Sequence, residues 1–345
     1  MKISVIIPCY NVENYISDCL DAILSQTIGI DCLEIIIVDD CSTDKTVEII
    51  SDYERRFSEQ IMLILCEKNG KQGTARNIGL QYATGDYISF VDADDWINHD
   101  MYKMLVGIAE SEECDLVQFR YQVRLDKSHE DENITDIQYS VYNILDVETR
   151  RNILLDSNII NESCTQKLYK RELLESANVF YAENVSYEEP LFTYPLKFHI
   201  KRIAVTETPL YYYRFNSNGT TASYMSKTST ILEHLQVQQM VLNRMVKSEF
   251  YQEYKEEIEF YYINTFFIEP FYFLKKRGTV LPLVLFEYMK KEILLYVPYL
   301  LTNKYVEFLD EQDRAILSLI NESKNVHDTA ELEKMIQDRQ NKLLV

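Results

Sequence analysis

The sequence has little of what non-globular and membrane-spanning chains need. It contains 8 Gly and 7 Pro among 345 residues, which excludes collagen-like and low-complexity architectures. No stretch approaches the ~18 uncharged apolar residues of a membrane span. The first apolar run, Ile3–Ile7, is too short for the core of a signal peptide, and no cleavage site follows it. We therefore expect a cytosolic protein, at most peripheral to a membrane.

Positive charge is also scarce. Lys and Arg total 35 against 55 Asp and Glu, so the net charge is −20. Such a surface repels polyphosphates, and we expect no nucleic-acid partner. An anionic substrate would need a local cation or a metal ion. The hydrophobic content of 46% is normal for a packed chain, and the length suggests about two domains.

The cysteines give neither a disulfide framework nor a zinc site. There are seven of them, an odd number, and no pair has CxxC spacing. Four of them, Cys9, Cys32, Cys66 and Cys164, sit in or beside apolar runs, and we interpret them as small buried hydrophobic residues in a reducing compartment.

The first third of the chain alternates β-branched runs with amphipathic segments. Strands are expected at Ile3–Ile7, Leu33–Val38, Ile61–Leu65, Tyr87–Val91 and Leu116–Val123. Helices are expected at 16–24, from about 47 to 53, at 74–83 and at 101–109. Ser42 or Thr43 should cap the second helix, and Gly70 and Gly73 should bracket a turn. This alternation predicts an α/β fold with a mostly parallel sheet and helices on both faces.

The rest of the chain is expected to hold an exposed, mobile excursion or hairpin and a helical region. Residues 124–150 are polar and irregular, and residues 226–345 have aromatic-rich helical spacing, with Pro270 expected to bend or end a helix. We predict domains at 1–225, divided into halves 1–96 and 97–225, and at 226–345. The aromatic faces of the last region suit packing on the first domain or on a second subunit as a homodimer. Docking at a membrane surface is a less favoured interpretation.

Three carboxylates follow the fourth expected strand. Asp92, Asp94 and Asp95 lie within four residues, and like charges this close favour a cation between them. Carboxylate oxygens suit Mg²⁺ or Mn²⁺ that keeps positions open for substrate phosphates. A solvated acidic turn is the simpler alternative, but the position after a buried strand favours metal binding.

The first two expected strands also end in polar residues. Asp39 and Asp40 could accept a hydrogen bond from a base such as uracil, whose N3 is a donor. Tyr10, beside Asn11, could stack on that base. A helix cap and ordinary packing explain these residues locally about as well.

A third segment, Lys71–Asn77, offers a turn, a helix N-terminus and two cations. Lys71 and Arg76 suit a diphosphate. The segment is neither a GxGxxG nor a Walker loop, so dinucleotide and P-loop functions are excluded. Arg76 on a solvated helix face is the simpler alternative.

Taken in series, four segments resemble the nucleotide-binding half of inverting family 2 glycosyltransferases, which have the GT-A fold. The segments are Ile3–Asn11, Leu33–Asp44, Asn69–Leu80 and Gly85–Trp96. The resemblance continues more weakly through residues 167–173, 187–192 and 211–214, and covers about residues 1–225. Beyond it we expect a helical C-terminal extension.

The resemblance assigns these residues to a nucleotide-sugar donor. It implies that Pro8, Tyr10 and Asn11 line the uridine pocket. Asp40, with its neighbour Asp39, matches the family's uracil-binding carboxylate. Asp92 and Asp94, with Ala93 between them, match the Asp-x-Asp pair that positions ribose, diphosphate and Mn²⁺ or Mg²⁺, with Asp94 the more direct metal ligand.

The resemblance assigns residues later in the chain to the acceptor side of the site. Glu188-Glu189 stands where the family usually has Glu-Asp, so Glu189 matches the catalytic base but carries one methylene more. Glu188 is the competing base. Lys167 and Arg214 match positions near the acceptor and the mobile loop. Asp95 and Trp96 are further acceptor-side candidates.

The resemblance implies a hexosyltransferase of bacterial polysaccharide synthesis. It would move a sugar from a UDP-sugar to a hydroxyl of a glycan or lipid-linked glycan, with inversion and a bound metal ion. Three other classes compete with this one. A receiver domain would need an acidic pair after the first strand, and a nucleotidyltransferase a Gly- and Arg-rich loop there; Cys9-Tyr10 provides neither. A non-catalytic member that binds a nucleotide sugar or glycan is supported by the change at Glu189.

Overall fold

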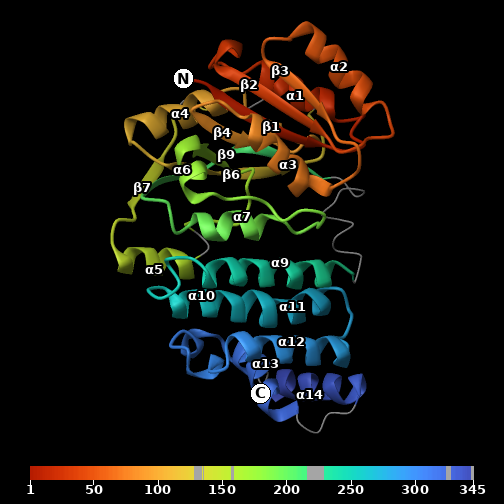
Figure 1. The fold of residues 1–345 in the computed structure, drawn as a ribbon, viewed down its shortest axis with the longest axis vertical. Helices are drawn as coiled ribbons and strands as arrows, with labels where there is room; N and C mark the ends of the chain where they lie inside the picture. The colour runs from red at the N-terminus through yellow and green to blue at the C-terminus, as the bar shows by residue number, and fades with distance from the viewer. Residues whose placement is uncertain (128–133, 135, 157–158, 216–228, 324–327, 343–345) are drawn as a thin grey trace. The chain divides into compact units, whose positions relative to one another are not determined.

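The computed structural model describes residues 1–127, 134, 136–156, 159–215, 229–323 and 328–342 (Figure 1). The chain divides into two compact units, Met1–Ala222 and Ser223–Val345. The predicted boundary at 225/226 lies outside the described residues. Within the described part, no helix is both long enough and apolar enough to span a bilayer.

Among the described residues, one nine-stranded sheet forms the centre of the N-terminal unit. Its strands are β1 (Ile3–Cys9), β2 (Leu33–Asp39), β3 (Ile61–Leu65), β4 (Tyr87–Phe90), β5 (Trp96–Ile97), β6 (Leu116–Arg124), β7 (Tyr139–Asn143), β8 (Lys167–Lys170) and β9 (Arg202–Arg214). The order is β3-β2-β1-β4-β8-β6-β9-β5, and β7 pairs with β9. The first four strands in this order are parallel, as are β6 and β9, whereas β8 runs antiparallel to both of its neighbours. The predicted α/β fold with a mostly parallel sheet is confirmed.

Helices cover both faces of this sheet because successive strand side chains point to opposite sides. One face carries Ile3, Val5 and Ile7 and packs on α1 (Ile16–Leu24), α2 (Thr46–Arg56) and α4 (Met101–Ser111). The other face carries Ile6 and Ile36. It packs on α3 (Lys71–Tyr82), α5 (Val147–Leu155), α6 (Arg171–Ala177) and α7 (Glu189–Leu196).

Two local predictions about helix starts are wrong. Gly73 lies inside α3, not in a turn before it. A Cβ atom at Gly73 would overlap the carbonyl oxygen of Ala182, so glycine there permits close packing of the helix on residues 182–188. Ser42 and Thr43 do not cap α2, because both bond to Asn11 instead; the Asp44 carboxylate accepts the Thr46 N–H at 3.0 Å.

The region 124–150 is more regular than predicted. Residues 128–133 and 135 lie outside the described part, but β7 pairs antiparallel with β9 and α5 follows it. The sequence pattern did not indicate β5, β7, β8 or β9. These strands are short or mix polar with apolar residues, and they are stabilised by pairing with distant strands.

The C-terminal unit is helical, as predicted. It contains α9 (Ser229–Val246), α10 (Lys255–Tyr262), a π-helix (Ile263–Ile268), α11 (Glu269–Lys276), α12 (Leu283–Tyr296), α13 (Glu311–Glu322) and α14 (Thr329–Lys342). Pro270 lies in the first turn of α11, directly after the π-helix, so the expected irregularity precedes the proline. Phe266, Phe267, Phe271 and Phe286 form part of the buried core.

Candidate active site

The loops after β1 and β2 are joined at one edge of the sheet. Cys9 and Asp39, the last residues of these strands, are register partners. Asn11, with a positive φ of 52°, links the two loops: its N–H donates to the Ser42 hydroxyl at 2.9 Å, and its side-chain oxygen accepts from the Thr43 N–H at 2.8 Å. The structure therefore brings the predicted base-binding residues together.

Within this edge, Asp39 and Asp40 are both buried but have different partners. Asp40 Oδ1 accepts the Gly70 N–H at 2.7 Å, which ties it to the start of α3. Burial raises the pKa of Asp40, and the backbone N–H groups of Gly70 and Lys71 oppose that rise. Asp39 Oδ1 accepts the Ser42 N–H at 2.9 Å, whereas its buried Oδ2 has no hydrogen-bond partner among the described residues.

The rest of the predicted donor segment lies around these carboxylates. Tyr10 is 48% exposed, so its ring is accessible for stacking. Pro8 lies within β1, one residue before its end. Lys71 is the first residue of α3 and has a positive φ of 63°, which is uncommon for a residue with a side chain.

Asp92 and Asp94 lie in the loop after β4. Residues of β9 hold this loop by hydrogen bonds. Asp92 and Asp94 are partly exposed, whereas Ala93 between them is buried. The Tyr211 hydroxyl accepts the Asp92 N–H at 3.1 Å and donates to Asp95 at 2.6 Å. The Asp-x-Asp motif did not identify Tyr211 as a support of this loop. The only sequence signal for it was its place in the segment 211–214, where the family resemblance continues weakly.

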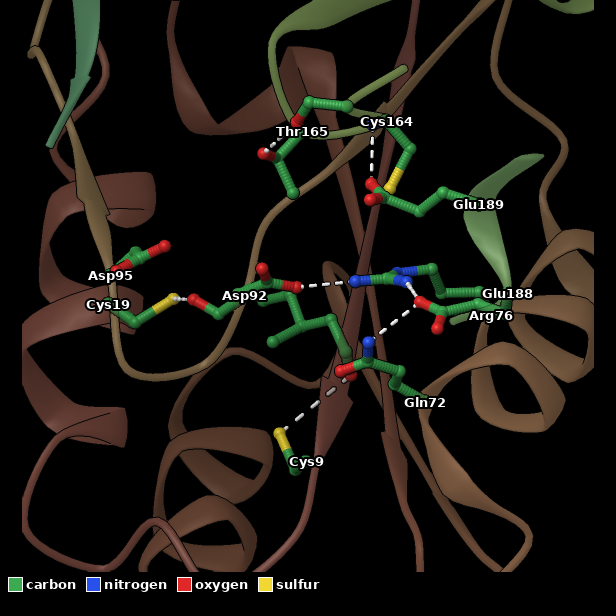
Figure 2. Close-up of polar contacts among 12 residues, drawn as sticks. Cys9, Cys19, Gln72, Arg76, Asp92, Asp95, Cys164, Thr165, Glu188 and Glu189 are labelled. Atoms are coloured by element: carbon green, nitrogen blue, oxygen red, sulfur yellow. Dashed lines mark hydrogen bonds and ion pairs between the residues drawn. The ribbon is translucent and has the colours of Figure 1, made fainter. Parts of the chain in front are cut away.

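A buried arginine joins this loop to Glu188 (Figure 2). Arg76 is 2% exposed, so the alternative of a solvated helix face is wrong. Its Nη2 donates to Asp92 Oδ1 at 2.7 Å, and its Nη1 donates to Glu188 Oε1. Gln72, one turn earlier on α3, also donates to that Glu188 oxygen at 2.7 Å. Burial raises the pKa of Glu188 to about 7, and the Arg76 charge opposes this rise.

Glu189 has a different environment from Glu188. It opens α7, is partly exposed, and accepts the Cys164 N–H on Oε1 at 2.8 Å (Figure 2). The loop carrying Cys164 is held by Lys167, whose Nζ donates to the carbonyl oxygens of Asn161, at 2.9 Å, and of Ser163. Burial lowers the pKa of Lys167 to about 8. Lys167 is 1% exposed and is thus a support of this loop in the structure, not a surface for an acceptor.

Three further acceptor-side predictions fall on buried residues. Asp95 is 1% exposed, and its carboxylate accepts from Tyr211 and from the Arg214 N–H, so it does not extend the Asp92–Asp94 pair towards a ligand. Trp96 is fully buried in β5. Arg214 lies against this loop, with Nε donating to the Asp94 carbonyl at 2.8 Å. These side chains are buried because β9 packs against the Asp92–Asp95 loop and pairs with β5.

The carboxylates of Asp92 and Asp94 fit a divalent ion whose remaining ligands would come from a substrate. Asp92 and Asp94 provide hard carboxylate oxygens of the kind that Mg²⁺ and Mn²⁺ prefer. Across the described ranges, no three His, Cys, Asp or Glu side chains gather closely enough to hold a metal ion by themselves. One or two carboxylates completed by diphosphate oxygens are the usual arrangement for Mg²⁺, so the residues fit such an ion.

This combination of strand-end carboxylates and a linked glutamate pair agrees with a match to a known family. The model of the family described as "Glycosyl transferase family 2" matches residues 4–177. This chain belongs to glycosyltransferase family 2. "Uncharacterized glycosyltransferase EpsJ" of Bacillus subtilis is 30% identical over 271 residues, covering 75% of this chain and 74% of EpsJ.

Another relative of this family 2 member is a much longer protein. "Poly(ribitol-phosphate) beta-N-acetylglucosaminyltransferase TarS" of Staphylococcus aureus is 27% identical over 270 residues, which are 77% of this chain and 44% of TarS. The crystal structure of S. aureus TarS 1–349 in complex with UDP-GlcNAc has a TM-score of 0.76 at 22% identity, covering 99% of this chain and 92% of that one. The expected GT-A fold is therefore confirmed.

Proposed function

We propose that this chain transfers a sugar from a UDP-sugar to a hydroxyl of a glycan acceptor, with inversion and with a divalent ion. One observation carries the proposal. The Asp92 and Glu188 carboxylates come from distant segments and meet at one buried cation, Arg76, and the partly exposed Glu189 follows Glu188 in the chain (Figure 2). A displacement at a sugar carbon needs a diphosphate site and a separate base, and this arrangement provides both.

On the donor side, Asp92 and Asp94 would hold the divalent ion. When bound, that ion would neutralise charge that develops on the leaving diphosphate. Arg76 adds a fixed positive charge next to Asp92, because its guanidinium is buried and held on its other side by Glu188. A preorganised cation of this kind needs little reorganisation as the leaving group departs.

On the acceptor side, Glu189 would take the proton of the attacking hydroxyl. Attack opposite the departing UDP inverts the configuration at the sugar carbon. Glu188 is a poor candidate for this role, because it is 1% exposed and bonded to Arg76 and Gln72. Glu189 is partly exposed, with one oxygen fixed by the Cys164 N–H.

The names of the relatives guide the choice of substrates. TarS is named as a poly(ribitol-phosphate) N-acetylglucosaminyltransferase, and its structure was determined with UDP-GlcNAc. We propose UDP-GlcNAc and UDP-glucose as the first donors to test here, and a bacterial surface polymer as the acceptor. Because this chain spans 44% of TarS, the identity of that polymer is left to the experiment.

The first experiment measures UDP binding by calorimetry. We expect binding with Mn²⁺ that collapses in EDTA and in Asp94→Ala. The matched control is Asp52→Ala, which removes an exposed carboxylate on α2 and should bind UDP like the wild type. UDP affinity that is unchanged by both EDTA and Asp94→Ala would contradict the metal assignment. Release of UDP from UDP-sugars then separates an enzyme from a protein that only binds the donor.

A further inference from the structure

Two arginines and a lysine gather beside the Asp92–Asp95 loop, at one end of β6 and β9. Arg124 and Arg214, the last residues of these strands, are register partners, so their Cα atoms are about 5 Å apart. Lys127 follows, and its Nζ donates to the carbonyl oxygen of Asp18 at 3.1 Å, while Arg214 Nη2 pairs with the Asp18 carboxylate at 2.7 Å. We propose that Arg124 and Lys127, beside the ion pair of the buried Arg214 with Asp18, form a subsite for a phosphate group of the acceptor. This inference rests on the proposed glycosyl transfer.

The two guanidinium groups are held by aromatic rings of the same sheet. The Arg124 Cζ atom lies 3.9 Å from the centroid of the Tyr212 ring, and the Arg214 Cζ lies 4.6 Å from that of Trp96. The Tyr212 and Trp96 rings pack on each other with centroids 5.7 Å apart. Stacking on rings orients a guanidinium plane without neutralising its charge. Arg214 is already paired with the Asp18 carboxylate, so Arg124, which bonds to a neutral amide oxygen, is the guanidinium available to an anion.

Arg124 also retains unused hydrogen-bonding capacity. Its Nε and Nη2 donate to the neutral amide oxygen of Gln122, at 3.3 and 3.2 Å. Its Nη1 is buried and has no acceptor in the part of the chain that the structure describes. By contrast, Arg120 on the same strand makes a two-pronged ion pair with Glu207, at 2.7 and 3.1 Å. A phosphate that takes the place of the Gln122 oxygen at Nε and Nη2 would give Arg124 what Glu207 gives Arg120 at the same two atoms.

The position of the cluster favours the acceptor over the donor. Arg214 Nε donates to the Asp94 carbonyl oxygen, so the cluster borders the proposed donor loop without using the carboxylates there. The donor diphosphate already has Arg76 and a divalent ion in the proposed mechanism. β6 and β9 belong to the part of the unit that follows the donor-binding strands. Arg214 is already paired with Asp18, so Arg124 and Lys127 supply the positive charge that is left for a ligand in a protein of net charge −20.

The test is calorimetry on the full chain saturated with Mn²⁺ and UDP, so that added anions do not enter the donor site. The probe is a hexamer of glycerol joined by phosphodiesters, and maltohexaose is the neutral control. We expect the hexamer to bind, to weaken as salt rises, and to weaken about fivefold or more in Arg124→Gln and in Lys127→Gln. Arg120→Gln is the matched control and should bind the hexamer like the wild type, because Glu207 already neutralises Arg120.

Three results would overturn the subsite. They are no hexamer binding by the wild type, equal weakening in Arg120→Gln, and lost UDP affinity with unchanged hexamer affinity in the Arg124 and Lys127 variants. The last result would assign the cations to the donor diphosphate. Lys127 is exposed, so its variant tests the idea even if Arg124→Gln fails to fold.

The same proteins separate this inference from the proposed function. UDP release from UDP-sugars is measured without acceptor. If the wild type releases UDP but does not bind the hexamer, only the subsite fails. If it binds the hexamer but neither binds nor cleaves any UDP-sugar, the proposed function fails, and the phosphate site then has no acceptor role.

Discussion

The two units treat buried polar groups differently. Among the described residues, the N-terminal unit buries eight charged side chains and the C-terminal unit one, Glu257. The eight are Asp39, Asp40, Arg76, Asp95, Lys167, Glu188, Lys197 and Arg214. Buried charge is costly and weak as a source of stability, so its concentration in one unit points to function there.

The C-terminal unit instead surrounds neutral polar groups with aromatic rings. His234 is fully buried, and its Nε2 lies 2.5 Å from the carbonyl oxygen of Thr265, inside the π-helix. Thr265 also donates from its hydroxyl to Gln238 at 3.1 Å. Burial lowers the pKa of His234 to about 4, which keeps it neutral at pH 7. This interior favours stability, whereas that of the N-terminal unit favours a preorganised site.

The largest expected effect tests whether the N-terminal unit is built for catalysis. It comes from removing the proposed base without disturbing the fold. Glu189→Gln keeps an oxygen for the Cys164 N–H but cannot take a proton. We expect transfer to fall about 10²–10⁴-fold with UDP-sugar affinity nearly unchanged. The measurement is initial rates with saturating donor.

The companion variant is Glu188→Gln, measured in the same assay. Wild-type transfer by Glu189→Gln together with loss in Glu188→Gln would mean that the two roles are exchanged. If neither variant slows transfer, the base lies elsewhere in the chain.

The next largest effect concerns the stability of the N-terminal unit. Arg76→Met leaves Glu188 buried without its cation, and we expect a loss of about 3–5 kcal/mol in the free energy of unfolding. Trp96, the single tryptophan, is buried in this unit and reports its unfolding by fluorescence in urea.

Two variants make this test specific. Adding Glu188→Gln to Arg76→Met should recover part of the loss, because the unpaired charge is removed. Arg55→Met removes an exposed arginine of α2 and should change stability by no more than about 0.5 kcal/mol. An equal loss in Arg55→Met and Arg76→Met would argue against a special role for the buried pair.

The two units should respond to pH in opposite directions. The raised pKa of Glu188 favours folding below pH 4.5, and this contribution is lost as pH rises through about 7. The lowered pKa of His234 gives a contribution that is present above pH 6.5 and is lost as pH falls towards 4. Each contribution should change by about 2 kcal/mol between pH 5 and 7, because a tenfold change in a protonation equilibrium corresponds to ~1.4 kcal/mol.

This difference is measured with Glu188→Gln and His234→Gln as references. Trp96 fluorescence follows the N-terminal unit and far-ultraviolet ellipticity the whole chain. The stability gap between wild type and each variant should change with pH in opposite senses. Gaps that stay constant from pH 5 to 7 would contradict both pKa values.

The smallest expected effect is on base selectivity. Asp40→Asn should lose about tenfold of the preference for UDP over CDP, which corresponds to about 1.5 kcal/mol for one charged hydrogen bond. Asp39→Asn is the paired variant, since Asp39 has a buried oxygen without a partner among the described residues. Loss of selectivity in Asp39→Asn alone would transfer the role to that residue.

The sequence determined the architecture of the N-terminal half closely. β3 matches its predicted range and β1, β2 and β4 differ by two residues or fewer, because buried parallel strands are continuous β-branched runs with polar ends. The Asp-x-Asp position could be predicted for the same reason. β5, β8 and β9 were not predicted, since their stability comes from pairing with strands far away in the sequence.

Roles within the site depended on tertiary contacts. From the sequence, Glu188 and Glu189 are equivalent neighbours, and Arg76 is one cation on an amphipathic helix. Only the packing of α3 at Gly73 against residues 182–188 brings Arg76 to Glu188. Glu189 instead bonds to the Cys164 N–H. The residue types and their order were thus fixed by local pattern. Which carboxylate is buried and which is accessible was decided by contacts between segments more than one hundred residues apart, where desolvation selects the partner.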